Sequence, residues 1–362
     1  MGIIAGEETG GRGSQPSSFR GAATASEVSR IRRLAAERAD GYNETREGQA
    51  PAGECDRTGR GYCRDRRIDG ADRGVRFGMI VNPTAGPANA HRKAQALQTV
   101  KTILGDCEVG GLETESREEF LRCATELARN VEVLIVAGGD GSFSDVINAL
   151  DSGTTFSYLP FGSGCALGYA LDLPPQLTRV AKRIKEGRLR LYDLILCDGE
   201  HKGFMTSVGL EADIIHRREA LRDSGISGPQ AYAVATFGSF FTELERTDMF
   251  IRIDGEELAV PNAVTAIVTK IPYYGYKMKV VPNAVFDDGQ LHLLAINSGW
   301  AEIVGGMANA FLYENKMGIY RKAREIRITT QRERYAQVDG NIYRKGTSFE
   351  FKVLPQALRM WC

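Results

Sequence analysis

No stretch of this sequence approaches the roughly 18–20 apolar residues that a membrane-spanning helix needs, so we expect no transmembrane segment. The formal net charge at pH 7 is zero, because the charges of 46 basic and 46 acidic residues cancel. Without a basic field, nucleic acid is not an expected partner. What remains is a chain of 362 residues, which is long enough for two globular domains.

Cysteine is sparse and shows no paired metal-ligand spacing. The seven cysteines are scattered, and Cys55 and Cys63 lie too far apart for a CxxC site. A reducing cytosol fits this usage best. The start of the chain lacks a basic region followed by an apolar one, so we expect no secretory signal. Gly6 stands where a myristoylation signal needs Ser or Thr.

Residues 1–74 differ in composition from the rest of the chain. They are rich in Gly, Arg, Asp and Glu, contain no Lys and offer few large apolar residues. Such a segment buries too little apolar surface to offset the entropy cost of ordering. Two interpretations stay open, a disordered N-terminal tail and a mis-assigned translation start.

Alternating strand and helix patterns begin at Phe77. Three apolar runs have the length and composition of buried strands, namely FGMIV (77–81), VEVLIVA (131–137) and FSYLP (156–160). Helical spacing of apolar residues predicts a helix over 88–104, and Pro175 and Gly187 bracket another. This alternation predicts an α/β domain over residues 75–190 with a Rossmann-like parallel sheet.

After about Leu189 the pattern changes to short β-like runs separated by Asp-Gly pairs, which are typical of tight hairpin turns. The pairs stand at 198–199, 254–255, 288–289 and 339–340. Helical stretches are expected near 229–244 and 299–312. We therefore predict a mostly antiparallel β-sandwich domain over residues 191–362, and leave open a return of the last residues to the first domain.

The motif GGDGS (138–142) follows a predicted buried strand and opens a predicted helix. Glycines there let backbone N–H groups approach phosphate oxygens, and a helix N-terminus adds positive potential. Asp140 at the tip of the turn is suited to orient a metal ion or accept a proton. An ordinary glycine-rich turn and a Rossmann dinucleotide loop are the alternatives, but the spacing is not GxGxxG and no Walker A lysine follows. We favour a phosphate site.

Two further loops of small residues follow predicted strands. NPTAG (82–86) ends the first strand, and PFGSGCALG (160–168) ends the FSYLP strand. In an open α/β sheet, ligands bind outside the carboxyl ends of the strands. Each loop alone is ordinary turn chemistry, but their order predicts that all three meet at one edge of the sheet.

The order of these and later motifs resembles one family of enzymes. NPTAG, VAGGDGS and LPFGSG are followed by SVGLEAD (207–213), PYYGYKMKVVPNAVFDDGQL (272–291) and QVDG (337–340). The set resembles the diacylglycerol-kinase and sphingosine-kinase catalytic-domain family, in the layout of the bacterial soluble lipid kinases. The resemblance runs from about Val75 to the C-terminus. GGDGS alone is shared with NAD kinases and phosphofructokinases, whereas the later motifs favour lipid kinases.

The resemblance implies a site for ATP and Mg²⁺. Asp140 would act through a magnesium ion on the transferring phosphoryl group, and Asp213 matches a carboxylate near the acceptor hydroxyl. Val285 and Gln290 would offer carbonyls, and Asp288 a carboxylate, to a structural magnesium ion. The residues implied at the nucleotide are Asn82, Thr84, Thr114, Gly138, Gly139, Asp140, Gly141, Ser142, Gly162 and Ser163.

The sequence departs from the family pattern at two places. Asn341 stands where bacterial members have a glutamate regarded as the general base, and an amide cannot accept a proton at neutral pH. Cys165 replaces an asparagine in the third loop. It is either a redox-sensitive thiol beside a helix N-terminus or a small buried filler. The basic run Arg179–Arg190 either touches anionic lipid or forms a solvated helix face.

These observations predict a cytoplasmic kinase, peripherally associated with a membrane, that transfers a phosphoryl group from ATP to a lipid hydroxyl of the diacylglycerol or sphingoid type. Positioning and charge neutralisation are the main requirements of such a transfer. Two alternatives stay open: a weak or inactive nucleotide- or lipid-binding homologue, supported by Asn341, and a NAD kinase-like enzyme. A homodimer is also left open.

Overall fold

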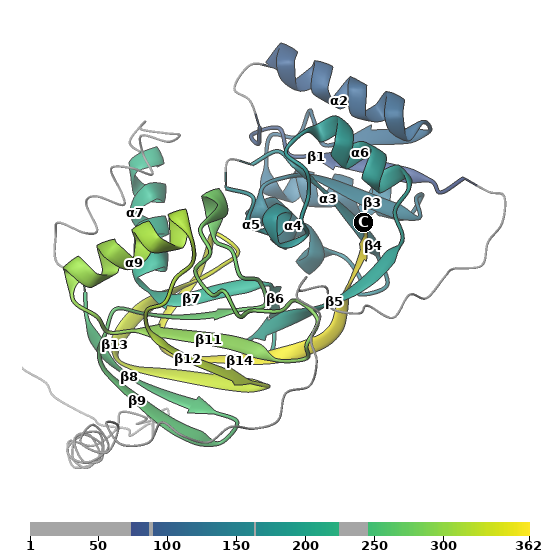
Figure 1. Ribbon diagram of the computed structural model, residues 1–362. Helices are drawn as coiled ribbons and strands as arrows, with labels where there is room; N and C mark the ends of the chain where they lie inside the picture. The colour runs from purple at the N-terminus through teal and green to yellow at the C-terminus, as the bar shows by residue number, and fades with distance from the viewer. Residues whose placement is uncertain (1–73, 87–89, 163, 224–244) are drawn as a thin grey trace, which may run out of the picture. The chain divides into compact units, whose positions relative to one another are not determined.

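The computed structural model describes residues 74–86, 90–162, 164–223 and 245–362 (Figure 1). They lie in the compact unit Thr58–Cys362. The interpretations of residues 1–73, the helix expected near 229–244 and the site residue Ser163 concern positions outside the described residues. Within the described ranges, no helix is both long and apolar enough to cross a bilayer.

The first domain is built on a parallel sheet, as the strand–helix alternation predicts. Its strands follow the order β4–β3–β1–β2, and every neighbouring pair is parallel. They are β1 (Phe77–Val81), β2 (Cys107–Gly110), β3 (Val133–Gly138) and β4 (Thr155–Pro160). Because all four run the same way, the loops that follow them emerge at one edge of the sheet.

Helices cover both faces of this sheet. On one face Val100 of α2 packs against Met79 in the same core cluster. On the other face Phe143 of α4 packs with Ile80. Side chains of neighbouring residues in β1 therefore pack against helices on opposite faces of the sheet, and the whole strand is buried. The helices are α2 (Ala90–Leu104), α3 (Arg117–Ala128), α4 (Asp140–Ala149), α5 (Ala166–Ala170) and α6 (Leu177–Lys185).

The second domain is a mostly antiparallel β-sandwich, as predicted. Ile251 of β8 and Leu293 of β11 lie on strands that do not pair with each other, yet both belong to one core cluster. Its strands are β5 (Leu189–Cys197), β6 (His201–Gly203), β7 (Met205–Gly209), β8 (Thr247–Ile253), β9 (Glu256–Ala263), β10 (Thr265–Thr269), β11 (Leu291–Ile296), β12 (Ile319–Ala323), β13 (Glu325–Val338) and β14 (Asn341–Trp361).

Three of the four Asp-Gly pairs form hairpin turns. Asp198, Asp254 and Asp339 each have positive φ and are followed by a glycine that also has positive φ. The loops at Asp254 and Asp339 are two-residue hairpins of the mirror-image type, whereas the loop at Asp198 has three residues. The turns join β5 to β6, β8 to β9 and β13 to β14. The fourth pair, 288–289, instead belongs to the loop before β11.

One strand runs through both domains. β14 is 21 residues long. It pairs in antiparallel fashion with β13 and β5, and near its end it runs parallel to β4 of the first domain. Its register with β5 shifts between Leu354 and Leu358. The described sheet is therefore continuous across the two domains.

Within the described part of the second domain, two α-helices lie over the sheet, one of which the sequence pattern did not predict. α9 (Trp300–Leu312) matches the helix expected near 299–312, whereas no helix was expected at α7 (Leu210–Asp223). Most side chains of α7 are polar, so its apolar stripe is short. Ile214 of α7 and Ile303 of α9 belong to one core cluster, which places both helices on the same face of the sheet.

Candidate functional site

The three loops that follow β1, β3 and β4 meet, as the sequence predicts for one edge of the sheet. The Asn82 amide donates a hydrogen bond to the Ser142 hydroxyl across 2.7 Å. A methyl group on Gly162 would lie 2.7 Å from the Gly139 Cα, so these two backbones touch. The side-chain ring of Phe161 covers Gly86 in the first loop, since a methyl group there would lie 2.6 Å from it.

The turn GGDGS places backbone N–H groups at the start of α4. Gly139 is the N-cap residue of this helix. Gly138 allows the turn to close, because a methyl group there would lie 2.7 Å from the Ser142 Cβ. The first N–H groups of a helix lack partners within the helix and attract anions. The turn therefore offers a positive, glycine-lined surface suited to phosphate oxygens.

Asp140 joins this turn to the third loop. Its carboxylate accepts hydrogen bonds from the backbone N–H groups of Ala166 at 2.7 Å and Leu167 at 3.1 Å. Burial raises the pKa of the Asp140 carboxyl, and these two amides oppose the rise. Both carboxylate oxygens thus accept hydrogen bonds from the third loop, so Asp140 holds the two loops in their conformation.

Lys93 holds the first loop and was not singled out from the sequence. The buried ammonium donates to the backbone carbonyls of Asn82 at 3.0 Å, Pro83 at 2.6 Å and Ala85 at 2.5 Å. The Asn82 side-chain carbonyl accepts from both the N–H and the hydroxyl of Thr84. Burial lowers the pKa of the Lys93 ammonium. The Lys93 ammonium and these side-chain hydrogen bonds therefore fix the positions of Asn82 and Thr84.

Thr114 lies in the turn after β2, which is the outermost of the parallel strands. Its hydroxyl donates to the Gly111 carbonyl at 2.7 Å. Gly111 approaches the end of β1 closely, because a methyl group there would lie 2.7 Å from the Val81 carbonyl oxygen. Thr114 therefore belongs to the same edge of the sheet as the three loops.

Asn341, in the second domain, reaches the start of α4. A methyl group on Gly141 would lie 2.8 Å from the Asn341 side-chain oxygen. The Asn341 amide lies 3.4 Å from a carboxylate oxygen of Asp145, which also forms an ion pair of 2.7 Å with Arg117. The position that a glutamate holds in the family is thus next to another carboxylate, which the sequence pattern did not single out.

Asp213 lies elsewhere, in the first turn of α7. Its carboxylate forms an ion pair with Arg334, which is buried and also binds Glu245 at 2.9 Å. Burial raises the pKa of the Asp213 carboxyl to about 6; Arg334 and Arg217 oppose the rise, and Glu245 and Glu211 add to it. Asp213 lines a small pocket of about 140 Å³, and no contact within the described ranges joins it to the three loops.

Asp339 is fully buried beneath the β13–β14 turn. Its carboxylate accepts from the N–H groups of Phe204 and Met205, the latter at 2.8 Å. Burial raises the pKa of the Asp339 carboxyl well above its usual range, and the nearby Asp140 adds to the rise. This enclosed carboxylate therefore stabilises the connection between β6 and β7.

Two of the three predicted magnesium ligands, Asp288 and Gln290, bind a lysine. The Lys270 ammonium donates to the Asp288 carboxylate at 2.8 Å and to the Gln290 carbonyl at 2.5 Å, and forms an ion pair of 3.0 Å with Asp193. Val285 contributes its N–H to His292 at 3.1 Å. Burial alone would raise the pKa of the Asp288 carboxyl, but its charged partners lower it to about 2.

His292 beside this cluster is neutral. Its Nε2 atom accepts from the Val285 N–H, so the proton sits on Nδ1, which lies 2.7 Å from the Tyr320 hydroxyl. Burial lowers the pKa of the His292 imidazole to about 4. The contact between His292 and Asp288 is therefore not an ion pair at neutral pH.

The loop between Lys270 and the 288–290 turn also reaches the third loop. The Tyr276 N–H donates to the Gly164 carbonyl at 3.1 Å, and Gly275 approaches Gly164 closely. In the same third loop, burial raises the pKa of the Cys165 thiol to about 11. The thiol is thus protonated at neutral pH, which favours the filler interpretation over a reactive cysteine.

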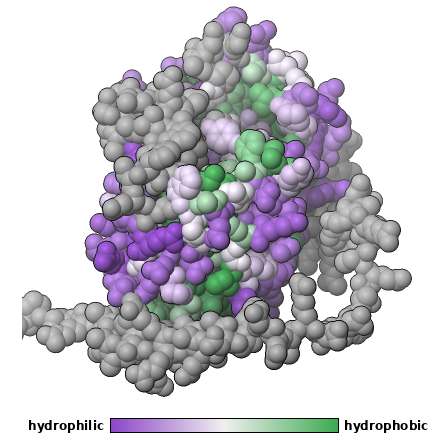
Figure 2. All heavy atoms as spheres, turned by 60° about the vertical axis from the view of Figure 1, so that its left-hand side comes forward, coloured by the Kyte–Doolittle hydropathy of each residue, from purple (hydrophilic) through white to green (hydrophobic). Residues whose placement is uncertain are grey.

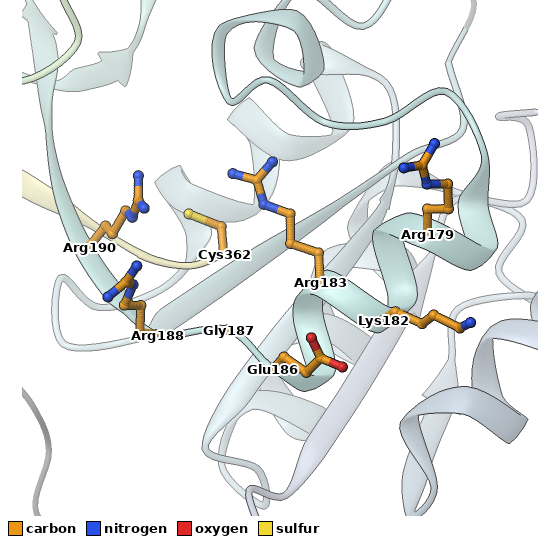
Figure 3. Close-up of a pocket in the computed structure, with 8 residues that line it drawn as sticks. All are labelled: Arg179, Lys182, Arg183, Glu186, Gly187, Arg188, Arg190 and Cys362. Atoms are coloured by element: carbon orange, nitrogen blue, oxygen red, sulfur yellow. The ribbon is translucent and has the colours of Figure 1, made fainter. Parts of the chain in front are cut away.

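The basic run 179–190 has a buried face and a charged one. Val180 and Ile184 of α6 are buried in the core. Arg183, Arg188 and Arg190 gather around Cys362 at a surface pocket of about 380 Å³ (Figure 3). The pocket lies at the amino end of β4, where Met360 pairs with Phe156. It is therefore at the opposite end of the sheet from the three loops.

Sequence reasoning missed Lys93, Asp145 and Lys270. Lys93 stands in the first turn of α2, where a positive charge opposes the helix dipole, and that conflict was an available signal. Lys270 directly follows the buried strand β10, where a charge needs a partner. Asp145 had no signal beyond its place three residues after GGDGS, because its neighbours come from distant parts of the chain.

A parallel sheet with three loops meeting at one edge, contacted there by a β-sandwich, defines a protein of two domains. The model of the diacylglycerol kinase catalytic domain matches residues 76–197, and the model of the YegS C-terminal NAD kinase beta sandwich-like domain matches residues 205–362. These two matches confirm the resemblance that the order of the sequence motifs indicated.

Relatives and solved structures agree with this assignment. A diacylglycerol kinase of Staphylococcus saprophyticus is 27% identical over 72% of this chain and 87% of its own length. An uncharacterized protein of Synechocystis is 24% identical over 78% of this chain and 69% of its own. The crystal structure of a diacylglycerol kinase from Bacillus anthracis superposes with a TM-score of 0.62 at 21% identity, covering 79% and 96% of the two chains, and supports the fold.

Proposed function

We propose that this protein is a lipid kinase that transfers the terminal phosphoryl group of ATP to a lipid hydroxyl. The observation that carries the proposal is the meeting of three small-residue loops with the N-terminus of α4, where Asn82 binds Ser142 and Gly139 touches Gly162. Relatives that carry the name diacylglycerol kinase support a lipid acceptor.

In this proposal the loops bind the nucleotide phosphates through backbone N–H groups. Magnesium bound to the phosphates would supply the charge neutralisation that phosphoryl transfer requires. Both Asp140 oxygens accept amide hydrogen bonds, but a carboxylate oxygen has a second lone pair. Asp140 fits a role near that cation, with its main task being to keep the loops in shape.

Asp145 is the carboxylate placed to accept the proton of the lipid hydroxyl. Asn341 cannot accept it, and the Asp145 oxygen lies 3.4 Å from the Asn341 amide. Arg117 fixes the orientation of this carboxylate. A general base typically contributes 10²–10⁴-fold, and little charge develops on the nucleophile in a loose transition state. A displaced base is therefore compatible with turnover.

The lipid would reach the protein from a membrane surface near α7 and α9. Phe311, Leu312 and Tyr313 at the end of α9 are 60–78% exposed. Figure 2, which brings this side of the molecule forward, shows apolar groups gathered among polar ones. Exposed aromatic and aliphatic side chains on a helix are suited to insert into the headgroup region. Peripheral binding at the cytoplasmic face, where ATP is present, is the proposed location.

The test is phosphoryl transfer from radiolabelled ATP, with vesicles of diacylglycerol, vesicles of sphingosine, and NAD as separate acceptors. We expect label in a lipid, a rate loss of about 10²–10⁴-fold in Asp145→Asn, and no loss in the exposed control Asp151→Asn. Adding Asn341→Glu to Asp145→Asn should restore part of the rate, because it returns a carboxylate to the same place.

The other outcomes identify the alternatives. Label in NAD alone would establish the NAD kinase-like enzyme instead. Binding of ATP by calorimetry without transfer to any acceptor would establish the inactive homologue, which Asn341 favours. A rate unchanged by Asp145→Asn would remove Asp145 from the base role while leaving the kinase assignment intact.

A further inference from the structure

Two of the three ligands that the family resemblance assigns to a structural magnesium ion, Asp288 and Gln290, already bind a cation of the protein itself. The Lys270 ammonium lies within 2.5–3.0 Å of oxygens from Asp193, Asp288 and Gln290. We propose that Lys270 is a built-in replacement for a metal ion at this turn, so that the second domain holds its 285–290 loop without magnesium.

The donor chemistry fits either cation, but not both together. Two carboxylates and a backbone carbonyl are oxygen ligands of the kind that magnesium uses. They are equally good acceptors for the three N–H groups of an ammonium. A magnesium ion would need the same oxygens at about 2.0–2.1 Å, and the ammonium occupies the space between them. The Lys270 side chain is fully buried, so it cannot simply swing into solvent.

The charges of the cluster also balance without a metal. Asp193 and Asp288 supply two negative charges, and Lys270 and Lys322 supply two positive ones, since Lys322 binds the outer Asp288 oxygen at 3.2 Å. His292 adds no charge, because its Nε2 atom accepts the Val285 N–H. Adding a divalent ion would leave two uncompensated positive charges in a largely buried place, which is costly.

The lysine joins three distant segments. Asp193 accepts from the Gly289 N–H at 2.7 Å and from the Gln356 N–H at 2.9 Å, where β14 shifts its register. Lys270 therefore ties the end of β10 to the 288–290 turn and to the strand that crosses both domains. The loop that starts after Lys270 also contacts Gly164. This anchoring role is independent of which substrate the protein uses.

Thermal melting of the full chain without nucleotide, in excess magnesium and in EDTA, tests the proposal. We expect the wild-type protein to melt at the same temperature in both. Lys270→Ala should melt lower in EDTA, because Asp193 and Asp288 then face each other without a cation. Magnesium should restore part of the loss, since the vacated space offers it oxygen ligands. Calorimetric titration with magnesium should show one more site in Lys270→Ala than in the wild type.

Lys322→Ala is the matched control, because it removes an exposed ammonium from Asp288 and leaves Lys270 in place; its melting should not depend on magnesium. If Lys270→Ala does not fold, Lys270→Met fills the space and should lose stability without magnesium rescue. A wild-type melting temperature that falls in EDTA, with no such fall in Asp288→Ala, would overturn the proposal. Magnesium-independent melting of a folded Lys270→Ala would overturn it as well.

Discussion

Replacing Gly139 by alanine separates the folding of the phosphate loops from their binding function. Gly139 has φ −93° and ψ −178°, a conformation that any residue adopts. A methyl group there would meet only the Gly162 Cα, at 3.6 Å, which is ordinary van der Waals contact. The substitution weakens the N-cap of α4 by about 1 kcal/mol at most. Gly139→Ala should therefore fold.

The methyl group nevertheless points into the space between the two loops where a phosphate is proposed to bind. Losing one charge-assisted hydrogen bond costs about 1.5–3 kcal/mol, which corresponds to a rise in Kd of roughly 10- to 150-fold. Gly162→Ala differs, because its methyl group would lie 2.7 Å from the Gly139 backbone. That variant should lose folding stability and nucleotide binding together.

Calorimetric titration with ATP and magnesium measures the binding effect, and thermal melting measures the stability effect. Gly153→Ala is the control, since a methyl group at Gly153 meets nothing within 4 Å. It should leave both quantities unchanged. Wild-type ATP affinity in folded Gly139→Ala would refute the reasoning and move the phosphates away from this turn.

Three further changes test other parts of the site. The pKa of the Asp213 carboxyl is raised to about 6 in the folded protein, against about 3.9 in the unfolded chain. The stability that its neutral form contributes is therefore fully present below a pH of about 3.9 and is lost as the pH rises through about 6. The melting temperature of Asp213→Asn should lack this fall, and identical pH profiles of variant and wild type would exclude the raised pKa. Lys93→Met leaves three carbonyls without their donor and should cost about 1–3 kcal/mol in denaturant unfolding; unchanged stability would contradict this. Phe311→Ser with Leu312→Ser should reduce sedimentation with diacylglycerol vesicles without changing the melting temperature, and undiminished sedimentation would exclude α9 as the membrane contact.

The sequence was most informative where a local pattern decides the structure. The buried run at 77–81 became β1 over the same residues, because a strand covered on both faces must be apolar along its length. Asp198, Asp254 and Asp339 formed hairpin turns for an equally local reason, since Asp-Gly accepts positive φ at both positions. The convergence of the loops followed from parallel strand order alone.

What the sequence could not supply were contacts between distant segments. Asp145 became a candidate base only through its contact with Asn341, which lies 196 positions further along the chain. Lys270 was invisible as a cation for Asp288 because no periodicity links the two. α7 was missed for a different reason. Most of its side chains are polar and its apolar stripe is short, so the helix depends on packing against the sheet and not on a periodic sequence pattern.

The passage of β14 through both halves has a consequence for how the protein comes apart. A strand whose hydrogen bonds serve β13, β5 and β4 in turn couples the unfolding of the two domains. Slow amide exchange in β4 and in β13 should be lost in a single cooperative step. A fragment ending near residue 190 would expose the β4 edge that β14 covers, and bare edges invite aggregation. We therefore expect the two matched regions, residues 76–197 and 205–362, to unfold together.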